Sequence, residues 1–256
     1  MKLLAGKKIL ITGLSNKFSI AFGIAESMHA HGAELAFTYS DMRLKKRIQN
    51  FAESFNSTIC LPCDVTHDSN IIKMFLKLSQ YWNKFDGFVH CIAFATRSQF
   101  KNDYLEVVSK DDFQKAHDIT SYSFVALAKK GRKMLNKNSS LLTLSYLGSI
   151  RAVPYYNVMG VAKASLEANV RYMACSMGNQ YVRVNAISSG PIRTLASSVI
   201  KNFNQVIKKY QMNSPIQRSV TIQDIGNTAS FLCSDLACGI TGQIIYVDNG
   251  FSITSI

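Results

Sequence analysis

Short apolar runs alternate with longer stretches of helical periodicity along most of the chain. The apolar runs are continuous, which is typical of strands buried on both faces of a parallel sheet. Strands are predicted over Lys8–Thr12, Glu34–Tyr39, Thr58–Pro62, Gly87–Ile92, Ser140–Ser145, Val182–Ile187 and Gln243–Val247. Helices are predicted over Ile20–Ala30, Ser69–Trp82, Asp111–Leu135, Asn157–Met177 and Thr221–Ser234.

This alternation predicts an α/β fold, namely a single doubly wound Rossmann-type domain. Its seven-stranded parallel sheet would be covered by helices on both faces. The length of 256 residues is sufficient for one large core. No Pro/Ser-rich linker, repeat or low-complexity segment divides the sequence, so residues 1–256 are expected to form one domain.

Composition and charge narrow the classes of protein. No apolar run approaches the roughly 18 residues of a membrane helix, and the start of the chain lacks the features of a signal peptide. We therefore expect a cytoplasmic protein with no membrane partner. Lys and Arg total 29 against 16 acidic residues, a net charge of +13. Because no nucleic-acid-binding module is visible, an acidic protein or a dinucleotide is the preferred partner over nucleic acid.

The six cysteines do not suggest a metal site. Cys60 and Cys63 form one C-x2-C pair, but no second pair or histidine cluster completes a set of zinc ligands. Buried structural thiols, with no metal and no disulfide, are the expected state of these residues.

Small or polar residues follow three of the predicted strands. Gly13 ends the first strand, and Ser19 and Gly23 are small residues beside the next helix, although the G-x-G-x-x-G spacing is missing. Asp64 follows the third strand, where it could bind an adenine amino group or act as a helix N-cap or turn residue. Cys91–Ala93 follow the fourth strand. Ligands of open α/β sheets bind at the carboxyl ends of strands, so a dinucleotide site is predicted there.

Tyr156 and Lys163 are seven residues apart in YYNVMGVAKASLE. If both lie on one helix, they share a face, with Cα atoms roughly 10.5 Å apart along the axis. A phenol and an ammonium that converge on one pocket can polarise a carbonyl oxygen and hold a sugar hydroxyl. The alternative is a tyrosine on a partly buried helix and an exposed lysine.

Longer segments of the sequence resemble one known family. They run through nearly the whole chain and include KILITG, SIAFGIA, CDV, LLTLSYLG, YNVMGVAKASLEANVRYMA and FLCSDLACGITG. In these segments the chain is similar to the NADH-dependent enoyl-[acyl-carrier-protein] reductases of bacterial fatty-acid synthesis, which are divergent short-chain dehydrogenases/reductases. The ordinary branch of that superfamily carries Tyr-x3-Lys, whereas here the residue four after Tyr156 is Gly160.

The resemblance implies a role for each matching residue. Tyr156 would be the catalytic phenol, Lys163 would bond the nicotinamide ribose, and Tyr146 falls on a further active-site position. Ala95 would touch the acyl substrate. The other cofactor-binding positions would be Gly13, Ser19, Ile20, Ser40, Asp64, Val65, Ile92, Ile192, Thr194 and Ala196. A lid that covers the substrate is expected around residues 192–212.

The resemblance also implies the reaction and its partners. Hydride from NADH would add to the β-carbon of a trans-2-enoyl thioester, and Tyr156 would stabilise the enolate. NADPH is the less favoured cofactor, because Asp41 after the second strand would repel a 2′-phosphate. The substrate would be carried by acyl carrier protein, expected to dock near Lys201, Lys208 and Lys209, and the enzyme is expected to be a homotetramer.

Several positions depart from the family pattern, and two other functions stay open. The departures are Ser40, Cys91, Ala93, Asn204, Gln205, Asn249 and the stretch Ala95–Ser98, which replaces a loop richer in Pro and Gly. One alternative is a carbonyl-reducing member of the superfamily, of the 3-oxoacyl carrier-protein reductase type, against which the Tyr-x6-Lys spacing argues. The other is a non-catalytic dinucleotide-binding regulator or basic nucleic-acid binder, against which the intact Tyr156 and Lys163 argue.

Overall fold

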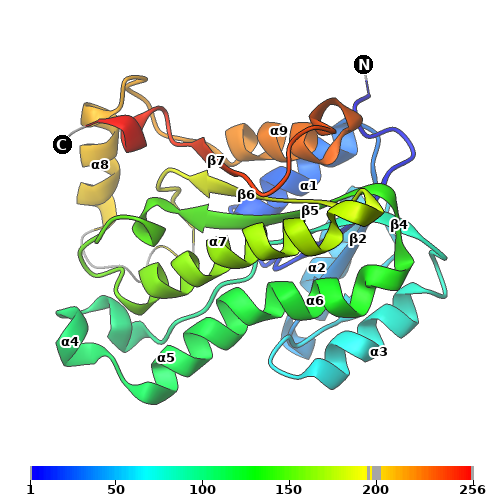
Figure 1. Cartoon of the computed structure of the whole chain (residues 1–256), viewed down its shortest axis with the longest axis horizontal. Helices are drawn as coiled ribbons and strands as arrows, with labels where there is room; N and C mark the ends of the chain where they lie inside the picture. The colour runs from blue at the N-terminus through cyan, green and yellow to red at the C-terminus, as the bar shows by residue number, and fades with distance from the viewer. Residues whose placement is uncertain (1, 195–196, 198–202, 255–256) are drawn as a thin grey trace.

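The computed structural model describes residues 2–194, 197 and 203–254, which include a seven-stranded sheet (Figure 1). The strand order is β3-β2-β1-β4-β5-β6-β7, and every neighbouring pair is parallel. The bounds are β1 Lys8–Thr12, β2 Glu34–Tyr39, β3 Cys60–Pro62, β4 Phe85–His90, β5 Leu135–Tyr146, β6 Arg183–Ser189 and β7 Ile244–Val247. The predicted fold class is therefore confirmed. One sheet with all these strands is in keeping with a single domain, which stays a prediction.

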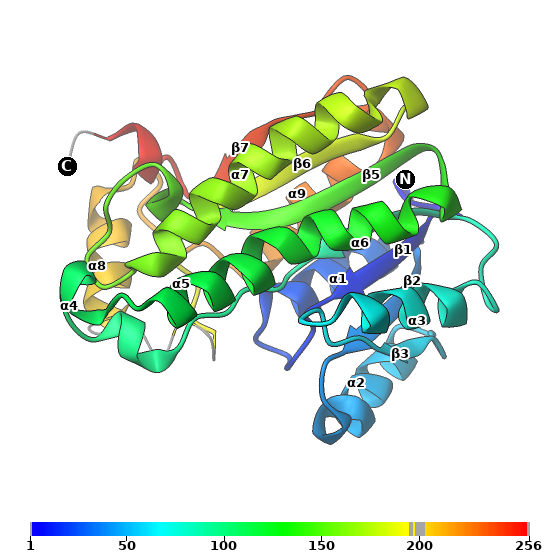
Figure 2. The same cartoon turned by 60° about the horizontal axis from the view of Figure 1, so that its bottom comes forward.

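Helices cover both faces of the sheet, as Figures 1 and 2 show with α6 and α7 on one face and α1 and α9 on the other. The two faces carry separate apolar cores. The helices are α1 Ile20–Ala30, α2 Met42–Ser54, α3 Asp68–Leu78, α4 Tyr104–Val107, α5 Lys110–His117, α6 Ser123–Gly131, α7 Val158–Met177, α8 Phe203–Asn213 and α9 Ile222–Cys233. Within the described residues, no helix has the length and apolar character needed to cross a membrane.

The segment predicted as one helix over Asp111–Leu135 is divided. A π-helical turn at Asp118–Tyr122 separates α5 from α6, and β5 begins at Leu135. Hydroxyl groups in this turn bond neighbouring elements, because Thr120 Oγ1 accepts from Phe94 N at 3.2 Å and Ser121 Oγ lies 2.8 Å from Ser165 Oγ. The apolar periodicity is continuous across the break, so it could not reveal these contacts.

The site is positioned by the close approach of β1 and β4, which are neighbours in the sheet. After these two strands the chain continues to opposite faces of the sheet. Ligands of open α/β sheets bind at the point where this happens. Gly13 has φ +83°, and a Cβ there would lie only 2.2 Å from the carbonyl oxygen of Cys91. Only glycine allows the two strand ends to approach this closely.

His90, at the end of β4, is fully buried and makes a hydrogen bond at each ring nitrogen. Nδ1 lies 2.9 Å from Thr143 Oγ1, and Nε2 lies 2.8 Å from Ser123 Oγ. Ser123 Oγ donates its proton to Ile119 O at 2.6 Å, so it accepts from Nε2. Burial, reinforced by the charge of Lys163, lowers the pKa of His90 to about 3. The imidazole is therefore neutral in the folded protein.

The low pKa of His90 predicts that the folded protein loses stability in acid. The unfolded chain binds a proton at His90 below about pH 6.5 whereas the folded chain does not, so stability is present above that pH and falls on acidification. We expect His90 to contribute a loss of about 1.4 kcal/mol of unfolding free energy per pH unit below about pH 6. Urea unfolding between pH 7 and pH 5 measures it, with His90→Gln as the variant that cannot titrate. Parallel pH dependences for the two proteins would contradict the prediction.

Candidate active site

A cavity of about 460 Å³ opens at the carboxyl ends of β1, β4, β5 and β6. Twelve of the residues singled out from the sequence line it, drawn from six separate parts of the chain. They are Gly13, Ser19, Ile20, Cys91, Ile92, Ala93, Ala95, Tyr146, Tyr156, Lys163, Ile192 and Thr194. Phe203 and Val206, at the start of α8, line it as well. The fold thus brings the predicted cofactor and substrate residues into one space.

Other predicted positions lie away from this cavity lining. Asp64 Oδ1 accepts from Thr66 N at 3.0 Å and from Thr66 Oγ1 at 2.8 Å, as a turn residue does. Val65 is buried in the core, and Ser40 is exposed at the end of β2. Ala196 lies outside the described residues. Contacts of Ser40, Asp64, Val65 and Ala196 with a cofactor stay predictions.

The helical argument for the Tyr156–Lys163 pair is wrong. Helix α7 begins at Val158, and its N-cap is Asn157, so Tyr156 belongs to the preceding turn. The turn forms because Tyr156 N donates to Val153 O at 3.0 Å and Met159 N donates to Tyr156 O at 3.1 Å. Both residues still line the same cavity. Tertiary packing, and not two turns of one helix, brings the phenol and the amine together.

The Tyr156 ring packs at the end of β5. It meets the Tyr146 ring edge-on with 4.8 Å between centroids, and a Cβ on Gly148 would lie 2.5 Å from Tyr156 Cδ1. Burial, and then Tyr146, raise the pKa of Tyr156 well above its ordinary value, so the phenol is protonated at neutral pH. The Tyr146 hydroxyl lies 3.0 Å from that of Tyr210, whereas the Tyr156 hydroxyl has no such partner among the described residues. The Tyr156 hydroxyl is therefore free to donate to a ligand.

Lys163 is buried, with only 6% of its surface exposed, which excludes the alternative of an exposed lysine. Its Nζ donates to Leu144 O at 2.7 Å, at the end of β5. Burial lowers the pKa of Lys163 to about 8, while Cys91 and Glu167 oppose that shift. The amine is therefore largely charged at pH 7 and becomes neutral as the pH rises through 8.

Glu167 follows Lys163 by four residues on α7 and is also buried, at 5% exposure. Its Oε1 accepts from Ser145 Oγ at 2.5 Å and from Ser149 Oγ at 2.6 Å. These serines lie on either side of Tyr146 in the sequence. Glu167 and Lys163 together attach α7 to the end of β5 that carries Tyr146.

The residues at the start of α1 fit the phosphates of a dinucleotide. Ser19, Ile20 and Ala21 line the cavity, and Ser19 caps the helix by accepting from Phe22 N at 3.3 Å. Because these residues begin the helix, its positive end lies at the cavity, and no acidic residue in the first turn offsets that charge. Because Gly13 carries no side chain, this residue presents only backbone atoms beside the start of α1. An anionic cofactor therefore fits this part of the site.

Asp41 is paired with Arg43 in the structure, whereas the sequence alone suggests an unpaired charge. It caps α2 by accepting from Arg43 N at 2.8 Å, and its carboxylate also accepts from the Arg43 guanidinium. These hydrogen bonds lower the pKa of Asp41 to about 2. Because Arg43 compensates its charge, Asp41 is a weaker barrier to a 2′-phosphate than expected.

Comparisons with known proteins add to this geometry. The chain matches the family Enoyl-(Acyl carrier protein) reductase over residues 13–252. It is 58% identical to the enoyl-[acyl-carrier-protein] reductase [NADH] FabI of Salmonella typhimurium, covering 100% of this chain and 97% of that protein. The Escherichia coli K12 protein of the same name gives the same identity and coverage.

The chain belongs to this family.

Solved structures of the family agree with it. The enoyl-[acyl-carrier-protein] reductase (NADH) of Aquifex aeolicus is 43% identical, with a TM-score of 0.96 and 99% of each chain covered. The Bacillus cereus reductase, solved with NADP+ and an indole naphthyridinone, has a TM-score of 0.97 at 43% identity with full coverage of both chains. The Anaplasma phagocytophilum enzyme in complex with NAD has a TM-score of 0.96 at 42% identity, with 99% and 97% covered. The resemblance read from the sequence is confirmed.

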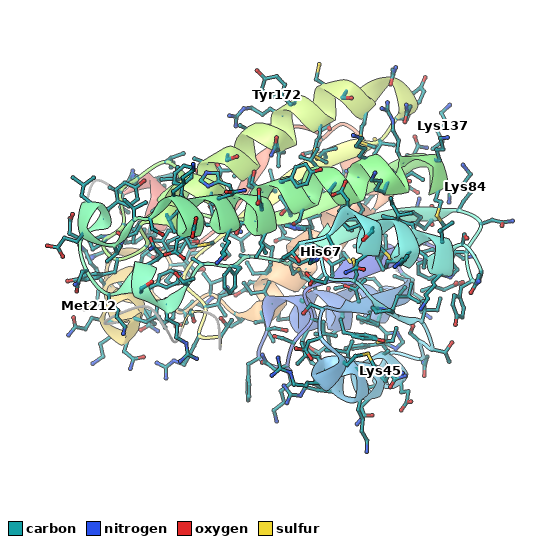
Figure 3. The ribbon with its side chains drawn as sticks, turned by 90° about the horizontal axis from the view of Figure 1, so that it is seen from below. Lys45, His67, Lys84, Lys137, Tyr172 and Met212 are labelled. Carbon is teal, nitrogen blue, oxygen red and sulfur yellow. The ribbon has the colours of Figure 1, made fainter. Side chains whose placement is uncertain are left out.

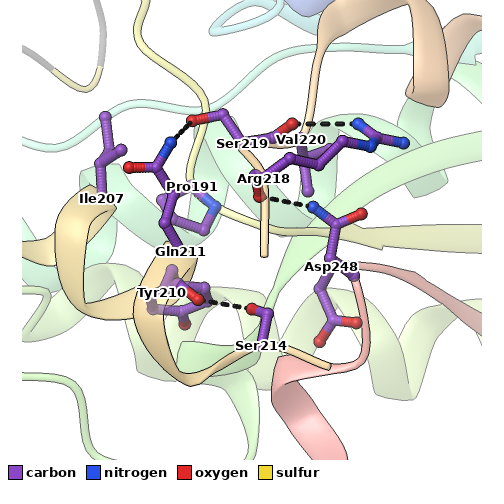
Figure 4. Close-up of a pocket in the computed structure, with 10 residues that line it drawn as sticks. Pro191, Ile207, Tyr210, Gln211, Ser214, Arg218, Ser219, Val220 and Asp248 are labelled. Carbon is purple, nitrogen blue, oxygen red and sulfur yellow. Dashed lines mark hydrogen bonds between the residues drawn. The ribbon is translucent and has the colours of Figure 1, made fainter. Parts of the chain in front are cut away.

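Some residues that build this reductase site carry no signal in the sequence. Tyr210 stacks on Phe251 with 3.6 Å between ring centroids and bonds Tyr146 from α8, 64 positions along the chain. Figure 4 shows how the end of α8 is attached around a small hollow, where Ser214 Oγ donates to Tyr210 O and Gln211 Nε2 donates to Ser219 Oγ. Gly148 and Glu167 also act through contacts that only the folded chain makes.

Gly148 gives a direct test of the packing around Tyr156. Alanine at this position would place a methyl group 2.5 Å from the Tyr156 ring, so the ring must move. Because a misplacement of about 1 Å costs roughly 100-fold in rate in other enzymes, we expect Gly148→Ala to lower kcat by about that factor. Enoyl-thioester reduction is the measurement.

Gly178→Ala is the matched control, because a Cβ there meets no atom within 4 Å. It should leave kcat unchanged. Equal activities of the two variants would show that Tyr156 does not depend on the space beside Gly148.

Proposed function

We propose that this chain reduces the trans-2 double bond of enoyl thioesters carried by acyl carrier protein, with NADH as cofactor, during fatty-acid elongation. The observation that carries the proposal is the single cavity that Gly13, Tyr156 and Lys163 share, in a chain of this family. The similarity to relatives named as NADH enzymes supports the choice of NADH.

Tyr156 supplies the hydrogen bond that the reaction needs. Bound NADH provides the hydride that adds to the β-carbon, and negative charge then develops on the thioester oxygen. A protonated phenol that donates to this oxygen stabilises the enolate where its charge appears. The raised pKa of Tyr156 favours this role, because the group keeps its proton at neutral pH. Tyr146, fixed by Tyr210, supports the ring and lines the substrate space.

Lys163 holds the ribose of the cofactor. Its ammonium already donates to Leu144 O and has two further protons to donate to sugar hydroxyls. Ile92 would support the nicotinamide half, and Ile192 and Thr194, which line the same cavity, would close over it. Ser19 and Ile20 hold the pyrophosphate at the positive end of α1.

The carbonyl-reducing alternative is disfavoured by the space around Gly160. In the ordinary Tyr-x3-Lys arrangement this position would carry the lysine. Here a Cβ on Gly160 would lie 2.6 Å from the carbonyl oxygen of Gly148, so no side chain fits. The buried amine comes instead from Lys163, one turn further along α7.

The substrate reaches the site beside α8. Residues 192–212 form the proposed lid, of which Ile192, Thr194, Ser197, Phe203 and Val206 line the cavity. Lys208 and Lys209 are exposed on α8, and the predicted contact at Lys201 lies outside the described residues. Acidic carrier protein would dock on this helix through the two lysines.

A homotetramer and a cytoplasmic location complete the proposal. Large apolar side chains stand on the surface, with Tyr172 79% exposed on the outer face of α7 (Figure 3) and Ile253 81% exposed near the C-terminal end. The homotetramer rests on the family resemblance, because singly exposed apolar side chains of this kind are normal on protein surfaces. The six cysteines are free thiols, in keeping with a reducing compartment.

The different roles proposed for Tyr156 and Lys163 predict that their substitutions affect turnover and NADH binding differently. Tyr156→Phe removes only the donor, so NADH binding should persist while kcat falls by about 100-fold or more, the cost of one such donor elsewhere. Lys163→Ala should weaken NADH binding as well as turnover. The assay follows NADH oxidation with crotonyl and acetoacetyl thioesters, and calorimetry gives NADH affinity. Full activity of Tyr156→Phe on a carrier-bound enoyl substrate would refute the assignment, and preferred use of acetoacetyl thioester would revive the carbonyl-reducing alternative.

The docking surface predicts a substrate-dependent effect. Lys208→Glu with Lys209→Glu should raise KM for carrier-linked enoyl substrate and leave KM for a small enoyl thioester unchanged, because only the carrier is acidic. Lys137→Glu is the control, an exposed lysine at the far end of the molecule from α8 (Figure 3). If both substrates respond alike, the carrier docks elsewhere.

A further inference from the structure

The chain on either side of Tyr156 has an unusual backbone. Tyr155 has φ +63° and Asn157 has φ +44° with ψ −125°, so two non-glycine residues with positive φ flank the proposed catalytic tyrosine. Each belongs to a tight turn closed by a main-chain bond, one at Val153–Tyr156 and the other at Tyr156–Met159. Tyr156 is therefore the residue shared by two consecutive turns.

The conformation of Asn157 favours glycine. Positive φ combined with ψ near −125° places it at the first central position of the turn that ends at Met159, which is a glycine position in such turns. A non-glycine residue in a sparsely populated region costs on the order of 1–3 kcal/mol and persists only when its surroundings hold it there. Something other than the backbone preference must therefore retain asparagine.

The Asn157 side chain makes the contacts that retain it. Nδ2 donates to Gln99 O at 2.6 Å and to Asn102 O at 3.0 Å, which uses both protons of the amide. These acceptors lie about 55 positions earlier in the chain, in the segment between β4 and α4. Arg97 and Phe100 of the same segment line the cavity.

That segment is itself fixed to α5. Gln99 is fully buried, and its Nε2 donates to Asp112 Oδ2 at 2.9 Å. Asp112 Oδ1 accepts from Thr96 Oγ1 at 2.8 Å. The segment that supplies the acceptors of Asn157 is thus held at Thr96 and Gln99, independently of the turn that carries Tyr156.

We propose that Asn157 is a positioning residue for Tyr156, whose amide joins the tyrosine turn to the Arg97–Asn102 wall of the substrate cavity. The Asn157 amide sets the direction from which the phenol reaches the thioester oxygen. It also couples that direction to the position of the cavity wall on which the acyl group lies. The inference rests on the proposed role of Tyr156. Lys163 and the α1 end are untouched, so cofactor affinity is independent of it.

Two variants separate the amide from the backbone. Asn157→Gly keeps a residue that adopts this φ and ψ freely but removes both donors. Asn157→Asp keeps the size and the tolerance of positive φ but presents a carboxylate without a donor at neutral pH. We expect each to lower kcat by about 10- to 100-fold, with NADH affinity by calorimetry unchanged. Asn56→Gly is the control and should keep full kcat, because Asn56 also has positive φ (+56°) but is exposed.

A double-mutant cycle tests whether Asn157 acts through the phenol. With Phe at position 156, Asn157→Gly should cause no further loss of kcat, and thermal unfolding reports whether each variant is folded. Wild-type kcat in Asn157→Gly would show that asparagine supplies only the turn and would overturn the proposal. Full additivity in the cycle would overturn it too, because a general structural defect acts without Tyr156. An unaffected Tyr156→Phe enzyme would instead remove the proposed function of Tyr156.

Discussion

The close contact between the start of α7 and the end of β5 is the constraint on which the rest of the active site depends. Gly148 and Gly160 let the two backbones approach, since a side chain at either position would collide with the other segment. Lys163 and Glu167 then bond the strand end through Leu144 O, Ser145 and Ser149. With this junction fixed, the rings of Tyr146 and Tyr156 meet edge-on in the lining of the cavity.

Burial gives the same junction its chemistry. A lysine and a glutamate taken out of water are stabilised by hydrogen bonds and by each other's charge, and burial moves the pKa of Lys163 to about 8. The same loss of water raises the pKa of Tyr156 and keeps its proton in place. One packed contact thus provides a cation for the cofactor and a neutral donor for the substrate.

The substrate part of the cavity is lined by segments that are attached to the rest of the fold in different ways. The last turns of α8 are anchored by Tyr210, which stacks on Phe251 and bonds Tyr146, while its first residues Phe203 and Val206 face the cavity. In another part of the site, Asn157 joins the tyrosine turn to the Arg97–Asn102 segment, which is held by α5. The acyl group would therefore lie between an anchored wall and the proposed lid.

The sequence by itself determined the strand and helix alternation, the parallel sheet and the family, because buried strands and long matching segments are written in local residue patterns. It also named twelve of the residues that line the cavity, since these follow strand ends or family motifs. Only the tertiary structure decided how Tyr156 meets Lys163, because the turn before α7 breaks the helical spacing that seemed to pair them. The tertiary structure alone revealed the roles of Gly148, Asn157, Glu167 and Tyr210 and the pairing of Asp41 with Arg43. These roles arise from hydrogen bonds, close packing and burial. Their partners are set by the folded chain and leave no periodic signal in the sequence.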